Sequence, residues 1–179
     1  MPNSAPIFYT LGHGTLQSDA FTTTLRAAGV TCAVDVRRFA GSRRHPQFGV
    51  PEMPAWLGAA NIAYRALPDL GGRREPADDS PNGGLRNRGF RGYADWMATP
   101  AFRTAFYRLI AIAEERPTAI FCAETLWWQC HRRFIADAAV VLRGYTVVHL
   151  TNATRATHVP TPELRVEGET LTYPGTTPG

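Results

Sequence analysis

Short apolar runs alternate with segments of helical periodicity along most of this chain, and that alternation constrains its fold more than any other feature. The runs have the length and composition of buried strands, and they are Ile7–Leu11, Thr31–Val36, Ile62–Arg65, Thr118–Cys122 and Tyr145–Leu150. Strands that alternate with helices are typical of a parallel sheet that is covered on both faces. We therefore expect an α/β fold with a mostly parallel sheet and helices on both faces.

The segments between these runs carry helix signals at their ends. A helix capped at Thr15 or Ser18 should end at Gly29, and a later helix should begin near Gln129 and end at Gly144, because glycine commonly terminates helices. Further helices are expected over residues 53–60, 93–97 and 100–116. Residues 75–92 are rich in Pro, Gly, Asp, Asn and Arg and predict a long loop. Residues 164–173 predict a hairpin-like extension.

The overall composition bounds the class of protein. A length of 179 residues suits a single domain over 1–179, with a C-terminal extension over 151–179. The hydrophobic share of 44% and the charged share of 19% are typical of a soluble globular protein. No apolar run approaches the roughly 20 residues that span a bilayer, the N-terminus lacks the pattern of a secretory signal, and three cysteines are too few for a disulfide framework. We expect a cytoplasmic protein with no membrane partner.

Arginine supplies all nineteen basic side chains of the chain, which contains no lysine. A GC-rich coding sequence would explain the missing lysine. It does not readily explain why ten of the nineteen arginines lie between Arg37 and Arg91. A guanidinium is a planar fork that suits carboxylates and phosphates, so this cluster indicates an anionic partner.

Ionisable side chains follow three of the expected strands, at the point where each strand ends. His13 follows the first strand, Asp35 and Arg37 end the second, and Cys122 and Glu124 follow the fourth run of apolar residues. In open α/β sheets, ligands bind at the carboxyl ends of the strands. Groups that are distant in sequence are therefore expected to converge at one edge of the sheet.

The richest stretch extends from Cys122 to Arg133, between a strand and the start of a helix, and it combines two thiols with a carboxylate, an imidazole and two guanidiniums. A helix start can lower the pKa of a nearby thiol, which makes thiol chemistry at Cys122 one hypothesis. The alternative is that Cys122 is a small core residue. We expect Cys130 to serve helix packing, Cys32 to lie in the core, and Arg132 rather than Arg133 to point inward.

Several cofactor classes are disfavoured by spacing. Cys122, Cys130 and His131 could be metal ligands. However, the two cysteines are eight residues apart and no second pair of ligands follows, whereas structural zinc sites usually have four ligands in closely spaced pairs. The loop over 124–129 has no glycine and makes a poor phosphate cradle. The segment Gly12-His13-Gly14 is too short for a dinucleotide fingerprint, and no lysine completes a phosphate-binding loop. We therefore predict no metal and no cofactor.

An ordered series of motifs resembles the family catalogued as domain of unknown function 488. The motifs are Gly12-His13, Asp35-Val36-Arg37, Ser42-Arg43, Pro46 with Phe48, Leu70-Gly71-Gly72, Gly92-Tyr93, Cys122 with Glu124, and Cys130-His131-Arg132. The resemblance covers about residues 8–150, and it departs from the family pattern at Gly14, where serine is common. It implies an α/β protein but no assigned activity. Matched residue by residue, it implies a site of His13, Asp35, Arg37, Arg43, Cys122, Glu124, His131 and Arg132.

These observations favour an enzyme, a hydrolase or transferase, that acts on a phosphate-bearing substrate such as a nucleotide, DNA or RNA. The expected catalytic residues are Asp35, Glu124, His13, His131 and Cys122. The expected substrate-binding residues are Arg37, Arg43, Arg44, Arg73, Arg74, Arg132 and Trp128. Two alternatives stay open: a non-catalytic module that binds an anion or nucleic acid, and thiol or metal chemistry at Cys122. Glu124 could also pair with Arg132 as a structural ion pair, which would remove it from the catalytic set.

Overall fold

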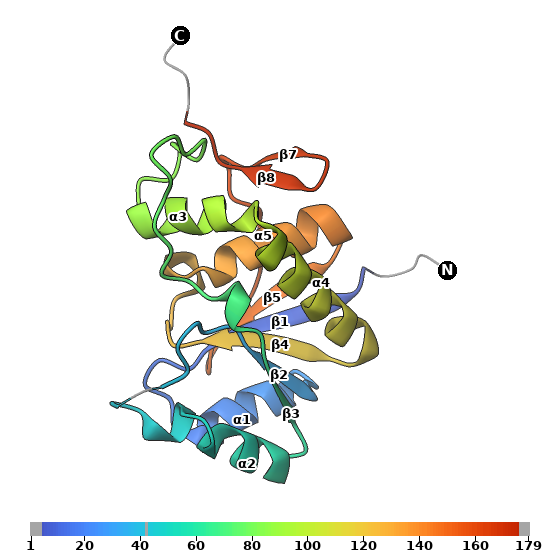
Figure 1. The fold of residues 1–179 in the computed structure, drawn as a ribbon. Helices are drawn as coiled ribbons and strands as arrows, with labels where there is room; N and C mark the ends of the chain where they lie inside the picture. The colour runs from blue at the N-terminus through green and yellow to red at the C-terminus, as the bar shows by residue number, and fades with distance from the viewer. Residues whose placement is uncertain (1–4, 42, 176–179) are drawn as a thin grey trace.

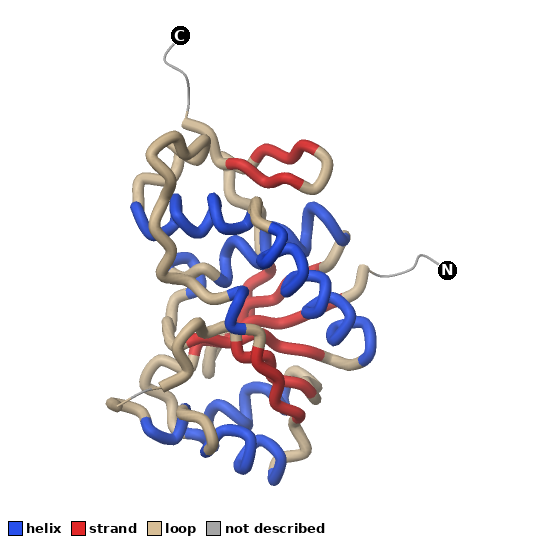
Figure 2. Tube along the Cα trace, in the orientation of Figure 1, coloured by secondary structure: helices blue, strands red, loops and turns tan. Residues whose placement is uncertain are grey.

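The computed structural model describes residues 5–41 and 43–175. A six-stranded sheet with the order β3-β2-β4-β1-β5-β6 runs through it (Figures 1 and 2). Five strands are parallel: β1 (Ile7–Gly12), β2 (Cys32–Asp35), β3 (Ala63–Ala66), β4 (Thr118–Cys122) and β5 (Thr146–Leu150). The sixth, β6 (Arg155–Thr157), is antiparallel to β5 at one edge and was not predicted. The predicted mostly parallel α/β sheet is confirmed.

Helices cover both faces of the sheet (Figure 1). One face carries α1 (Ser18–Ala27) and α2 (Glu52–Ala59), and the other carries α3 (Arg88–Met97), α4 (Pro100–Glu115) and α5 (Arg132–Arg143). Successive strand residues point to opposite faces, so neighbouring residues of β2 enter different cores: Ala33 packs in the cluster with Phe21, and Val34 in the cluster with Phe134. Within the described ranges, no helix is both long enough and apolar enough to cross a bilayer.

Helix ends agree with the sequence signals in part. Gly29 and Gly144 have φ angles of 72° and 67°, the left-handed backbone that glycine adopts most easily. The predicted cap of α1 is wrong, because Gln17 occupies that position and forms no side-chain cap. Helix α3 starts five residues before the predicted Tyr93, since the Asn87 side chain accepts a hydrogen bond from the Phe90 amide and caps it. A 3-10 turn, Trp127–Gln129, precedes α5, which begins at Arg132 rather than near Gln129.

The predicted C-terminal hairpin consists of β7 (Arg165–Glu167) and β8 (Thr170–Thr172). The chain after β8 is bound to the long loop that precedes α3. The Tyr173 amide donates to Asn82 Oδ1 at 2.8 Å, and the Gly84 amide donates to the Tyr173 carbonyl at 2.9 Å. Asn82 also donates to Asp95 Oδ1 on α3 at 2.7 Å. The loop and the extension thus stabilise each other beside α3.

Candidate functional site

The carboxyl ends of three neighbouring strands form one edge of the sheet. Gly12 at the end of β1 is in register with Cys122 at the end of β4, and Asp35 of β2 is in register with Phe121. The His13 amide donates to the Cys122 carbonyl at 2.9 Å. His13, Asp35 and Cys122 therefore share one edge, where the strand-end pattern of the sequence predicts them.

A pocket of about 310 Å³ opens at this edge. Cys122, Cys130 and His131 line it together with Tyr93, and the exposed side chains of Arg38 and Arg73 also belong to its wall. The volume lies at the lower end of the range of small-molecule sites. The pocket therefore suits a small ligand, or one residue of a polymer, rather than a long chain.

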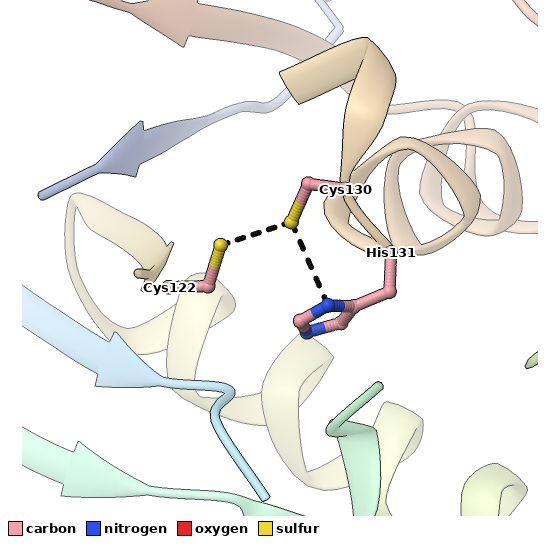
Figure 3. A group of neighbouring side chains, drawn as sticks. All are labelled: Cys122, Cys130 and His131. Carbon is pink, nitrogen blue, oxygen red and sulfur yellow. Dashed lines mark hydrogen bonds between the residues drawn. The ribbon is translucent and has the colours of Figure 1, made fainter. Parts of the chain in front are cut away.

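Two thiols meet on the wall of this pocket. The sulfurs of Cys122 and Cys130 lie 2.9 Å apart, each residue is 2% exposed, and neither forms a disulfide, for which the two sulfurs would lie about 2.05 Å apart. Figure 3 shows the two side chains pointing toward each other, one from the end of β4 and one from the residues before α5. Both cysteines lie in the buried core cluster, which agrees with the packing role predicted for Cys130 and with the core alternative for Cys122, and their sulfurs also face each other at the pocket wall. Cys32 is in the core, as predicted.

Arg132 lies behind the cysteine pair and is 1% exposed, which confirms that it points inward. Its Nε donates to Cys122 Sγ at 3.1 Å and lies 3.4 Å from Cys130 Sγ. One terminal nitrogen donates to Thr10 Oγ1 at 3.3 Å, and the other donates to the main-chain carbonyl of Glu124 at 2.6 Å. The ion pair considered for Glu124 and Arg132 is therefore wrong: their contact uses the backbone, and the Glu124 side chain is exposed.

A buried guanidinium requires a negative partner, because an unpaired charge is costly to remove from water. Among the described residues, the groups that contact Arg132 and can become anionic are the two thiols. Burial by itself raises the pKa of Cys130, but Cys122, His131 and Arg132 together bring it well below its usual value. Burial raises the pKa of Cys122 well above its usual value. The two thiols therefore titrate as a pair, and the Arg132 guanidinium that contacts both sulfurs stabilises the singly ionised form of that pair.

His131 is oriented toward the Cys130 sulfur. Its Nε2 lies 2.9 Å from the Val36 carbonyl, which can only accept, so Nε2 carries a proton. Its Nδ1 faces Cys130 Sγ at 3.5 Å (Figure 3). The proton of this contact lies either on the sulfur, beside a neutral ring, or on Nδ1, where an imidazolium faces a thiolate.

Two glycines make room for these groups. A Cβ at Gly12 would lie 1.9 Å from the Glu124 carbonyl, and one at Gly72 would lie 2.9 Å from His131 Nδ1. Both distances are shorter than a side chain tolerates. These glycines let the loop after β4 and the His131 ring approach the neighbouring backbone.

The same three side chains are the donor set that a soft metal ion would use. The ligand atoms of Cys122, Cys130 and His131 all lie within 4.8 Å of one another, and a metal-bound histidine commonly donates its second ring nitrogen to a carbonyl. However, a divalent ion with two thiolates and Arg132 would leave a net positive charge in a buried site. The guanidinium also already donates to the sulfurs. Charge balance favours the metal-free thiolate.

Asp35 and Arg37 bind each other and are not free for the roles that the sequence predicts. Arg37 Nε donates to Asp35 Oδ1 at 2.8 Å, and a terminal nitrogen donates to Oδ2 at 2.6 Å. Oδ2 also accepts from the Tyr64 hydroxyl at 2.9 Å. Both side chains of the pair are buried. The carboxylate is therefore occupied by donors, and the guanidinium is not available as a phosphate clamp.

His13 belongs to the interior rather than to the pocket. It is 2% exposed, its ring stacks on Phe48 at 4.2 Å, and its Nδ1 lies 3.0 Å from the Gly14 carbonyl. The other nitrogen, Nε2, lies 3.5 Å from an Arg37 terminal nitrogen. Burial lowers the pKa of His13 to about 4, so the ring is neutral near pH 7 and accepts from Arg37. This contact supports the ion pair instead of acid catalysis.

The remaining predicted binding residues are scattered. Arg43 and Arg44 are exposed and do not line the pocket, and Ser42 of the same motif lies outside the described residues. Arg74 stacks 3.7 Å above the Trp96 ring. Trp128 is 48% exposed and packs against Trp127 away from the pocket. Of the predicted arginine clamp, only Arg73 lines the pocket with its exposed side chain.

Arg38 is the cation that the sequence analysis missed. It lies beside Arg73, whose carbonyl accepts a hydrogen bond from it at 3.0 Å. Adjacent residues of extended chain point in opposite directions, so Arg37 turns inward to Asp35 while Arg38 turns outward to the pocket. Asp35 ends an apolar strand, and a buried carboxylate there needs a cationic partner. This signal could have assigned Arg37 to Asp35 and Arg38 to the pocket.

A family model described as "Domain of unknown function DUF488" matches residues 17–139. The match includes the cysteine pair, His131, Arg132, Arg38 and Arg73, and it leaves out β1, β5 and the C-terminal extension. No curated protein and no solved structure is similar enough to the chain to give a match.

Proposed function

The chain belongs to the DUF488 family, and from the geometry of its site we propose that it is a thiol-dependent enzyme acting on a small anionic substrate. Cys130 is the nucleophile, Cys122 and Arg132 stabilise its thiolate, and His131 moves the proton. This proposal moves the chemistry from Asp35 and His13, which are bound in structural contacts, to the cysteine pair.

A single observation carries the proposal: Arg132 is buried with its Nε against two sulfurs and without a carboxylate among its described partners. A structural cysteine pair needs no buried cation. A thiolate at the wall of a pocket does, because the thiolate rather than the thiol is the nucleophile. Placing the guanidinium there keeps that nucleophile charged at neutral pH.

The chemistry that follows is group transfer. The Cys130 sulfur donates an electron pair to an electrophilic centre of the substrate and forms a bond to it. The bond to the leaving group breaks, and the leaving group departs with its electron pair and takes a proton from the imidazolium form of His131. Water or an acceptor molecule then displaces the sulfur, while neutral His131 takes up the proton of the attacking group. The outcome is hydrolysis with water and transfer with another acceptor.

Two exposed guanidiniums outnumber the one exposed carboxylate of the pocket wall, that of Glu124, and this balance supports an anionic substrate. Arg38 and Arg73 are exposed at its wall, and no ion pair involves either of them among the described residues. Free guanidiniums bind carboxylates and phosphates through two parallel hydrogen bonds. Phe90 and Tyr93, also in the wall, offer apolar surface to a ring, so a nucleotide or the end of a nucleic acid fits this chemistry. Three free thiols suit the reducing cytoplasm.

Paired electrophiles of opposite character test this function without a known substrate. Iodoacetate is anionic and iodoacetamide is neutral, and both alkylate thiolates. Peptide mapping by mass spectrometry should show Cys130 as the first residue alkylated, with a higher ratio of iodoacetate to iodoacetamide rates than free cysteine has. Arg38→Ala and Arg73→Ala should each lower this ratio several-fold, and Arg43→Ala, which removes an exposed arginine outside the pocket, should not.

Two results would count against the proposal. If Cys130 reacts no faster than free cysteine, the thiolate is absent, and the alternative of a non-catalytic anion-binding module is favoured. If Cys130 reacts quickly but shows no preference for iodoacetate, the anionic substrate class is wrong and the nucleophile stands.

A further inference from the structure

A buried chain of hydrogen bonds leads from Arg132 to Asp137, five residues further along α5. Arg132 contacts Thr10 Oγ1 at 3.3 Å, and Thr10 Oγ1 lies 2.7 Å from His149 Nδ1. His149 Nε2 lies 2.9 Å from His158 Nδ1, and His158 Nε2 lies 2.9 Å from Asp137 Oδ1. All five side chains are buried. They come from β1, β5, α5 and the segment after β6.

The direction of every bond follows from the carboxylate at the end. Ionised Asp137 can only accept, so His158 donates from Nε2 and, when neutral, accepts at Nδ1. His149 must then donate from Nε2 and accept at Nδ1, which commits the Thr10 hydroxyl proton to His149. The Thr10 oxygen is left to accept from Arg132. Burial lowers the pKa of His149 to about 3, which keeps this ring neutral near pH 7.

The C-terminal extension fixes the carboxylate at the end of this chain. Asp137 also accepts from the Thr161 amide at 2.9 Å, from the Thr161 hydroxyl at 2.7 Å and from the Tyr173 hydroxyl at 2.9 Å. Trp127, in the turn between the two cysteines, stacks on the His149 ring at 4.0 Å. The series of hydrogen bonds from Arg132 to Asp137 is therefore held in place by contacts from other parts of the sequence.

We propose that Thr10, His149, His158 and Asp137 are positioning residues of the thiol site, and that they hold Arg132 with its Nε against Cys122 and Cys130. The proposal rests on the proposed function, since it assumes a thiolate at Cys130. If Arg132 needed only a hydrogen-bond acceptor for its terminal nitrogen, any carbonyl or hydroxyl would serve. Here the acceptor is fixed through three further groups, so the guanidinium plane cannot turn away from the sulfurs without breaking the chain.

The other groups that face Cys130 set the background for any test by pH. They are Cys122 at the end of β4, His131 and Arg132 at the start of α5, Tyr93 of α3, and, at longer range, His149 of β5. Of these groups, Thr10 makes polar contacts to Arg132 and His149 alone among the described residues, and only Arg132 of the two contacts the Cys130 sulfur. An effect on Cys130 must therefore pass through Arg132.

The test is the pH profile of Cys130 alkylation by iodoacetamide in the full chain. Thr10→Val removes the hydroxyl at nearly constant volume and should raise the midpoint of the profile by about one pH unit, the size expected when a charge-assisted hydrogen bond is lost. Thr10→Ser keeps the hydroxyl and should retain the wild-type midpoint. Tyr173→Phe removes a contact of Asp137 outside the path and should lower the melting temperature without moving the midpoint. His149→Gln interrupts the chain one step further and should shift the midpoint as Thr10→Val does.

The outcomes separate the two proposals. If the midpoint is low in the wild type and equally low in Thr10→Val and His149→Gln, the positioning role is overturned while the thiolate stands. A wild-type midpoint near that of a free thiol would overturn both, since no thiolate would then exist to be positioned. Because Thr10→Val could fail to fold, either variant that folds decides the matter.

Discussion

Arg132 and Cys122 lie ten residues apart on either side of a turn, and the guanidinium Nε of one donates to the sulfur of the other at 3.1 Å. The contact ties the end of β4 to the start of α5 across the pocket wall. Its partners make Arg132 a cation enclosed by carbonyls, a hydroxyl and two sulfurs. Among these described partners, only the sulfurs can become anionic.

Removing the guanidinium should therefore reprotonate the cysteine pair. In Arg132→Met, the charge and the hydrogen bonds to both sulfurs are lost, and the pKa of Cys130 should rise toward its ordinary value. Arg132→Lys keeps the charge without the fork, and it should retain part of the low pKa. Ultraviolet absorbance of the thiolate, followed against pH, measures both. An unchanged profile in Arg132→Met would show that the guanidinium does not stabilise the thiolate.

Asp35→Asn should affect stability and spare the thiol chemistry. The substitution strands the buried Arg37 guanidinium, and breaking a buried pair in this way costs about 3–5 kcal/mol. Urea denaturation should show the loss, while the rate of Cys130 alkylation in the folded variant stays within about twofold of wild type. A normal stability with slow alkylation would return Asp35 to the catalytic set.

Glu124→Gln provides the opposite expectation. The Glu124 side chain is exposed and its contact with Arg132 uses the main chain, so the melting temperature should change little, as surface substitutions typically stay within about 0.5 kcal/mol. Thermal melts of the two proteins measure this directly. A fall of many degrees would mean that the carboxylate itself is bound to the guanidinium.

Two buried histidines predict a loss of stability in acid. Burial lowers the pKa of His13 to about 4 and that of His149 to about 3, both below the value of about 6.5 expected for an unfolded chain. At a pH between the folded and the unfolded pKa of each histidine, the unfolded state binds more protons than the folded state does. The free energy of unfolding therefore falls as the pH drops below about 6.5. The loss between pH 7 and pH 5 should be about 2 kcal/mol for each histidine. Urea denaturation at the two pH values measures it, and His13→Gln should make the dependence shallower.

The fold was predictable because its signals are local. Each parallel strand corresponds to a short apolar run in the sequence, and Gly29 and Gly144 follow helix ends where expected. The site was predictable as a place, because parallel strands bring His13, Asp35 and Cys122 to one edge whatever their spacing in sequence. Strand β6 has an exposed three-residue pattern, and it offered no apolar signal to detect.

The roles within the site were not predictable, because they depend on partners from elsewhere in the chain. The burial of Asp35 hinted at a partner such as Arg37, but nothing in the sequence indicates that Tyr64 also donates to its carboxylate. Cys130 lies eight residues after Cys122, a spacing that matches no common metal or redox motif, and only the tertiary fold brings the two sulfurs together. Thr10 and His149 lie inside strands, where a polar residue in an apolar run gives no sign of its partner.

The measurement that tests the thiolate most directly is the pH dependence of iodoacetamide alkylation at each cysteine of the wild-type protein, resolved by mass spectrometry. Metal analysis of the same sample shows whether a soft ion occupies the thiols, and Cys130→Ser identifies the peptide that carries the signal. We expect Cys130 to react with a midpoint well under the value of about 8.5 for a free thiol, because Cys122, His131 and Arg132 lower its pKa, while Cys122 reacts only at higher pH and Cys32 stays protected. A Cys130 midpoint at or above 8.5 in metal-free protein would contradict the account.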